Sequence, residues 1–255
     1  HGWGKGRRGK GRGRDGAGVD SVAVTTASTA PDDRPLGTTD PASAPTEGTP
    51  FLPQVDDASG ATALARELRR LRGLVAGSVY EDVHDAVATV RALVDHLEAV
   101  GTKVRPADYA TWGVPEHIAS NPAIGSRNPV SPPLEPVVFP DGTVRAELRL
   151  GIEYQGPPGC VHGGIVALIF DEMLGLANAA AGSVGMTADL RVVYKSPTPL
   201  YSPLRFEARQ DRVDGRKIWA GATLHAGDTL CATAEALFIE PRGIRDADRG
   251  RPIEG

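Results

Sequence analysis

The sequence predicts an α+β domain in which an antiparallel sheet wraps around one central helix. Three observations lead to this prediction. A long and almost wholly apolar helix is expected at residues 159–182, which read GCVHGGIVALIFDEMLGLANAAAG. An alternating segment precedes it, and several strand-like segments follow it. A sheet that surrounds the helix would bury it on all sides, which would explain why the helix lacks a polar face.

The strands are expected at 143–154, 186–196, 204–214, 216–227 and 229–240. In the first of them apolar and charged residues alternate, as in a strand with one buried face. The last three are separated by Asp214-Gly215 and Gly227-Asp228, which are typical of tight hairpin turns. These segments define the expected domain at 143–241, and a flexible C-terminus is expected at 242–255.

The part of the chain before this domain divides into three segments. Residues 1–57 are rich in Pro, Gly, Ser, Thr and Ala, and we expect a disordered tail. Apolar residues recur at helical spacing over 58–101, which predicts a helical hairpin that covers the domain or joins a subunit contact. Residues 102–142 are Pro-rich, and because prolines lack a backbone donor we expect a connecting segment without regular structure.

Composition excludes some classes of function. The chain has 40% hydrophobic and 24% charged residues, as soluble globular proteins do. Residues 1–14 carry six basic and no acidic residues, so the rest holds 22 basic and 32 acidic residues and argues against nucleic-acid binding. Apolar runs stay shorter than the roughly 18 residues of a membrane span. The two cysteines match no metal or redox spacing, and we expect a cytoplasmic location.

Asp171 is a carboxylate in the middle of the apolar helix. Burying an unpaired carboxylate costs roughly several kcal/mol, so such a residue has a structural partner or serves chemistry. Gly163 and Gly164 open the helix, where unsatisfied N–H groups and the positive end of the helix dipole could hold a developing oxyanion. His162 could cap this turn, although a tight strand-to-helix turn explains the His-Gly-Gly sequence about as well.

The spacing of these residues constrains any site that uses both ends. Asp171 follows Gly163 by eight residues, so the two lie about 12 Å apart along one helix axis at about 1.5 Å per residue. One small carbonyl group cannot contact both. A shared site therefore needs two helices related by a two-fold axis, each supplying its N-terminus to the acid of the other. We expect a homodimer, or a dimer of dimers, with sites across the interface.

A resemblance to a known family adds to this interpretation. The HGG sequence, Asp171 nine residues after His162, and the later GMTADLRVVYKSPTPL closely resemble the hotdog-fold acyl-CoA thioesterases of the 4-hydroxybenzoyl-CoA and phenylacetate-degradation type. The resemblance covers about residues 143–240. It implies a hotdog fold that dimerises through a continuous sheet. It also implies hydrolysis of acyl-CoA thioesters, a reaction of fatty acid metabolism, with no metal and no cofactor beyond the coenzyme A of the substrate.

The resemblance also implies roles for individual residues. The N–H group of Gly163 would polarise the thioester carbonyl, and Gly164 would support the turn. Asp171 would act as nucleophile or general base, and Thr187 would help to place the attacking water. His162 would have an orienting role.

Three further residues are weighed from their positions. Asn178 shares the helix face of Asp171 and could line the cleft, or could satisfy backbone groups near the helix end. Lys195 ends the strand of Thr187 and is the candidate for binding the phosphates of coenzyme A. Glu172 is the alternative acid, although adjacent helix positions point about 100° apart, so only one of the two acids can face a cleft.

Other functions stay open at this point. One is a non-catalytic acyl-CoA binding or sensing protein on the same fold. Another is a hotdog dehydratase or hydratase, which would need a histidine acting with a carboxylate on the acyl chain. A third is an interaction protein that works through residues 59–100. No Gly-x-Ser-x-Gly sequence is present, which disfavours an α/β-hydrolase.

Overall fold

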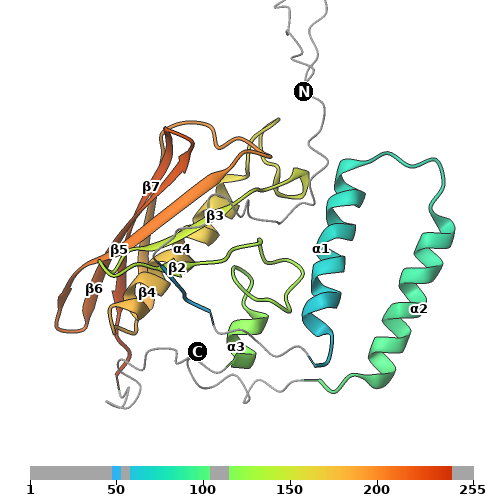
Figure 1. Cartoon of the computed structure of the whole chain (residues 1–255), viewed down its shortest axis with the longest axis horizontal. Helices are drawn as coiled ribbons and strands as arrows, with labels where there is room; N and C mark the ends of the chain where they lie inside the picture. Colours follow the sequence, from blue (N-terminus) through green and yellow to red (C-terminus); the bar gives the residue numbers. More distant parts are fainter. Residues whose placement is uncertain (1–47, 53–57, 104–114, 243–255) are drawn as a thin grey trace, which may run out of the picture. The chain divides into compact units, whose positions relative to one another are not determined.

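The computed structural model describes residues 48–52, 58–103 and 115–242. The predicted tail at 1–57 and the predicted C-terminal segment at 242–255 fall almost entirely outside these ranges, so both stay predictions. Within the described residues, a seven-stranded antiparallel sheet packs against one long helix, α4 (Figure 1).

The sheet contains β1 (Thr49–Pro50), β2 (Val137–Val138), β3 (Val144–Leu148), β4 (Met186–Tyr194), β5 (Leu204–Asp214), β6 (Lys217–Ala226) and β7 (Thr229–Ile239). Their order across the sheet is β1-β2-β3-β5-β6-β7-β4, so β4 forms one edge. Both predicted hairpin turns are present. Gly215 and Gly227 adopt φ angles of 56° and 57°, the left-handed region that glycine tolerates without strain.

The predicted strand at 143–154 is wrong in its second half. β3 ends at Leu148, and a short 3₁₀ helix, η3 (Ile152–Tyr154), follows. Leu150 and Tyr154 are buried outside the sheet ladder. Their burial continues the apolar alternation beyond the strand, and this misled the prediction.

The central helix α4 (Gly163–Ala180) lies along the sheet as predicted. Its core face includes Val166, Ile169, Phe170 and Met173, and the ring of Phe170 meets Phe206 of β5 edge to face, 5.3 Å between centroids. By length and composition alone α4 could cross a membrane. Its packing against the sheet accounts for that apolar composition.

The expectation that α4 is buried on all sides is wrong for the single chain. A stripe that includes Gly164, Leu168, Asp171 and Gly175 stays exposed or partly exposed. These positions follow one another at helical spacing, so they form one open side of the helix. The sheet covers the opposite side.

Two helices occupy the segment before the domain, as the spacing predicts. They are α1 (Ala61–Gly77) and α2 (His84–Val100). The buried residues Ala65 and Gly73 lie on the side of α1 that packs on the same chain, and Arg69 donates to the carbonyl oxygens of Gly125 and Ser126 over 3.3 and 2.9 Å. In contrast, every residue of α2 is exposed. Over 102–142, α3 (Pro115–Ser120) and β2 are regular, and residues 104–114 lie outside the described ranges.

Candidate active site

Asp171 and Thr187 meet on the open side of α4. The hydroxyl of Thr187, near the start of β4, donates to Oδ1 of Asp171 over 2.8 Å. Thr187 is exposed and Asp171 is partly exposed. The carboxylate is therefore not sealed in the core, and it combines a hydroxyl partner with access from outside the chain.

An extra residue in β4 decides which way Thr187 faces. Thr187 pairs with Phe238 and Asp189 pairs with Leu237, so Ala188 has no partner on β7. Such a β-bulge shifts the alternation of side chains by one position. Residues seven apart face opposite sides of a regular strand, yet Thr187 and Tyr194 both contact α4.

The N-terminus of α4 keeps one backbone donor available. The N–H group of Gly164 donates to Nδ1 of His162 over 2.9 Å, so His162 caps the helix. Within the described part of the chain, the N–H group of Gly163 has no hydrogen-bond acceptor. Gly163 therefore offers the donor at this helix end, and Gly164 does not.

Tyr194 holds the first peptide group of α4, and the sequence analysis missed it. Its hydroxyl donates to the carbonyl oxygen of Gly163 over 2.7 Å. A Cβ atom at position 163 would lie 3.1 Å from that hydroxyl oxygen, closer than ordinary van der Waals contact. A side chain at this position would therefore require the Tyr194 ring to shift by a few tenths of an ångström. The odd spacing between Tyr194 and Thr187 concealed the role of Tyr194, because the bulge cannot be seen in the sequence.

The turn after β4 supports the start of α4. The N–H group of Val161 donates to the carbonyl of Thr198 over 2.8 Å, and that of Leu200 donates to the carbonyl of Gly159 over 3.0 Å. On the other side, the N–H group of His162 donates to the carbonyl of Tyr154 over 2.9 Å. The segment that positions Gly163 is thus held by backbone hydrogen bonds on two sides. Side-chain patterns in the sequence do not predict these bonds.

Glu172 faces a different part of the chain from Asp171. Nδ2 of Asn121, from the segment before the domain, donates to Oε2 of Glu172 over 3.0 Å. Burial raises the pKa of Glu172 above its ordinary 4.5, the bond from Asn121 opposes this, and the charge of Asp171 adds to it. The two adjacent acids therefore differ in environment, and Asp171 is the one beside the exposed strand.

Asn178 and Lys195 lie apart from the Asp171 carboxylate. Asn178 is 1% exposed, and its Oδ1 accepts a bond from Nε2 of Gln210 over 3.2 Å. This burial favours the structural role over the cleft-lining one. Lys195 is exposed and directly follows Tyr194. In the sequence it is therefore nearer to the residue that contacts Gly163 than to Thr187, which contacts Asp171.

One chain thus carries two separate groups. Asp171 and Thr187 form the first, and His162, Gly163 and Tyr194 form the second. Because α4 is uninterrupted, Gly163 and Asp171 stand about 12 Å apart along its axis.

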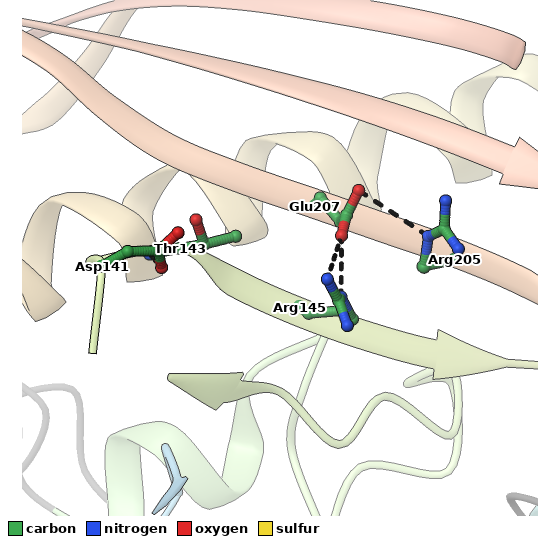
Figure 2. A network of polar contacts seen from close by, with 5 residues as sticks. All are labelled: Asp141, Thr143, Arg145, Arg205 and Glu207. Atoms are coloured by element: carbon green, nitrogen blue, oxygen red, sulfur yellow. Dashed lines mark hydrogen bonds and ion pairs between the residues drawn. The ribbon is translucent and has the colours of Figure 1, made fainter. Parts of the chain in front are cut away.

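A second polar cluster lies on the sheet face opposite α4 (Figure 2). Nε and one terminal nitrogen of Arg145 contact Oε1 of Glu207 at 2.7 and 2.6 Å, and Nε of Arg205 lies 3.7 Å from Oε2. It borders an open hollow of about 700 Å³. These charges pair with one another, so the cluster has the character of a surface network. Among the residues described, no group of three His, Cys, Asp or Glu side chains could hold a metal ion.

Comparisons with known proteins agree with the resemblance seen in the sequence. No family model matches the chain. The chain is 40% identical over 92 residues to acyl-coenzyme A thioesterase THEM4 of Mus musculus, a match of 35% of this chain and 40% of that protein. It is 27% identical over 111 residues to acyl-coenzyme A thioesterase THEM5 of Homo sapiens, which covers 42% and 45%. The chain thus spans less than half of the length of these two curated relatives.

A solved structure extends the likeness over most of the chain. The crystal structure of a thioesterase superfamily protein matches with 33% identity and a TM-score of 0.68, over 76% of this chain and 97% of that one. This match is wider than residues 143–241, so it also includes part of the segment before the domain. The predicted hotdog fold is confirmed, while the expected branch of the family stays a prediction. The chain belongs to the thioesterase superfamily.

Proposed function

We propose that the chain hydrolyses acyl-CoA thioesters to a free acid and coenzyme A, in sites that two copies build together. The observation that carries this proposal is the Asp171–Thr187 pair, a carboxylate with a hydroxyl donor on the open side of an otherwise apolar helix. A purely structural acid would gain more from a sealed, fully bonded position. Similarity to proteins named acyl-coenzyme A thioesterases supports the substrate class.

The sheet edge supports a site shared between two copies. β4 is the last strand of the sheet, and most of its residues are exposed. An edge strand offers unpaired backbone groups to another strand. In our proposal, β4 pairs antiparallel with β4 of a second copy about a two-fold axis. The N-terminus of the partner's α4 then approaches Asp171, which bridges the distance that one chain cannot.

The proposed chemistry needs only groups that the chain provides. The N–H group of the partner's Gly163 polarises the thioester carbonyl, and the positive end of its helix favours the developing negative charge. A water bound between Thr187 and Asp171 attacks the acyl carbon while its proton passes to Asp171. The carbon–sulfur bond then breaks, and the leaving thiolate takes up that proton. Direct attack by Asp171, followed by hydrolysis of the anhydride, uses the same groups.

Lys195 is proposed to bind the phosphates of coenzyme A. It directly follows Tyr194, which holds Gly163, so both would belong to the subunit opposite the catalytic acid. A role in fatty acid metabolism and a cytoplasmic location remain part of the proposal. His162 would act by capping the helix, because its Nδ1 is already engaged with the N–H group of Gly164.

The proposal is tested by thiol release from short, long and aryl acyl-CoAs. We expect hydrolysis by the wild type and a loss of about a hundredfold or more in kcat for Asp171→Asn, which keeps the shape of the side chain. The matched control is Glu172→Gln, the same change at the adjacent acid, which should retain activity. Equal rates for the wild type and Asp171→Asn would refute the catalytic assignment. Binding of acyl-CoA without any hydrolysis would favour the sensing protein.

A further inference from the structure

Helix α2 has an apolar face that nothing in the described structure covers. Five residues, Val83, Val87, Val90, Val94 and Leu97, follow one another at alternating spacings of four and three, and each is between 37% and 48% exposed. Leu93 and Val100 widen the same face and are exposed too. This pattern gives about three apolar positions in seven, which is typical of a helix inside a bundle.

A helix of 17 residues needs a packing partner. Most helices in proteins are stabilised by burial of an apolar face rather than by helix propensity, and α2 is rich in valine, which is a weaker helix former than alanine. The companion helix α1 does not supply that burial, because its own Leu71, Leu74 and Val75 are exposed as well. The segment thus presents two uncovered apolar faces, one on each helix.

We propose that α1 and α2 bind the same two helices of a second copy of this chain, forming a four-helix bundle. A two-fold contact requires a self-complementary surface. The α1–α2 segment is such a surface, since one copy carries both faces that need covering. α1 is fixed to its own domain through Arg69 and through Arg72, whose guanidinium lies 4.8 Å from the ring centre of Tyr154. α1 is therefore held in place on its own domain and can pack against the helices of the second copy.

Charge favours α2 against α1 of the other copy. α2 and the turn before it carry five acidic residues against one arginine, Arg91, and Glu81, Asp82, Asp85, Asp95 and Glu98 are the acids. The exposed side of α1 carries Arg66, Arg70 and Glu67, a net charge of +1, and Glu67 lies 3.7 Å from Arg70. Opposite charges across a helical interface set partner and orientation, and like charges oppose the pairing of two α2 helices. The acidic character of α2 also disfavours an anionic lipid surface.

This contact differs from the one proposed at β4. The described contacts of α1 are with residues 125–130 and η3, and none of these belongs to β4. The bundle therefore does not rest on the proposed function. Together, the two contacts would give a dimer of dimers, and the bundle alone would give a dimer.

The test is the mass of the full chain in solution, measured by light scattering for the wild type and for Val90→Asp/Val94→Asp. Because both valines are exposed in the single chain, the substitutions remove no core packing. We expect the variant to have half the mass of the wild type, whichever other contact is present. The control Ala88→Asp/Ala92→Asp adds the same charge to the opposite side of the same helix and should keep the wild-type mass.

A second measurement covers the case in which α2 frays in the variant. Amide hydrogen exchange in α2 of the wild type should slow as the protein concentration rises, because association buries the helix. Arg66→Glu/Arg70→Glu on α1 should weaken association without touching α2. Identical masses for the wild type and Val90→Asp/Val94→Asp, or exchange that is independent of concentration, would overturn the proposal in favour of another occupant.

Discussion

Subunit complementation tests the composite site most directly. Asp171→Asn removes the acid, and Gly163→Val places a branched side chain where even a Cβ atom would lie 3.1 Å from the Tyr194 hydroxyl. Each variant alone should be inactive. When both variants are coexpressed with different tags, a mixed dimer has one site with both defects and one site with neither.

The expected magnitude follows from the symmetry and from the length of the helix. Random pairing makes about half of the dimers mixed, and each has one of two sites intact, so the mixture should regain about a quarter of wild-type activity. The distance of about 12 Å between Gly163 and Asp171 along α4 is the physical reason, because it forbids a site within one chain.

A control with the same substitutions in one chain separates the alternatives. The double variant Gly163→Val/Asp171→Asn, mixed with wild type, should leave about a quarter of the activity if sites are shared, and about half if each chain has its own site. The assay is thiol release from an acyl-CoA by the unseparated mixtures and then by the mixed dimer isolated through both tags, which should have about half of wild-type activity for the two single variants. An inactive mixed dimer from the two single variants, shown to be folded, would refute the shared site.

Three further substitutions probe the groups around the site. Thr187→Val removes the hydroxyl donor to Asp171 and should lower kcat about a hundredfold with KM unchanged, while Thr187→Ser keeps the hydroxyl and should retain most activity. Steady-state kinetics measure both constants, and a wild-type kcat for Thr187→Val would contradict the role of the hydroxyl. Tyr194→Phe loses the hydrogen bond to the Gly163 carbonyl and should lower the free energy of unfolding in urea by about 0.5–1.5 kcal/mol and also lower kcat. If neither value changed, Gly163 would not need this hydrogen bond. The pKa of Glu172 is raised in the fold, so the folded chain binds its proton more tightly than the unfolded chain, and the wild-type free energy of unfolding should fall as pH rises above about 4.5. Glu172→Gln should lack this decline in urea titrations at several pH values, and parallel curves for both proteins would contradict the assignment.

Much of the fold is predictable because local patterns and long-range packing agree. The hairpin strands β5, β6 and β7 alternate in polarity and are separated by Gly215 and Gly227 at positive φ, so turn chemistry and burial indicate the same register. The strand expected through Tyr154 failed because burial alone produces alternation without a ladder. The open side of α4 was not predicted. The apolar composition of a helix indicates that its surface must be buried, but it does not indicate whether the same chain or another one buries it.

The candidate site is predictable only in part. Asp171 is conspicuous because a carboxylate is costly in an apolar helix, and Gly163 because two glycines mark a close approach. Tyr194 was missed because aromatic residues near strand ends are common. Its hydroxyl also donates to a backbone carbonyl, and no pair of side chains in the sequence indicates such a bond. The backbone bond from Val161 to Thr198 has no signature in the sequence at all.

The unpaired Ala188 has a consequence for engineering this strand. Thr187 and Tyr194 reach the same helix across an odd interval, which only an irregular ladder permits. A segment grafted from a regular strand would therefore keep one contact and send the other side chain to the outer surface, whatever residues it carried. Deleting Ala188 would do the same, so segment length at this edge is as restrictive as residue identity.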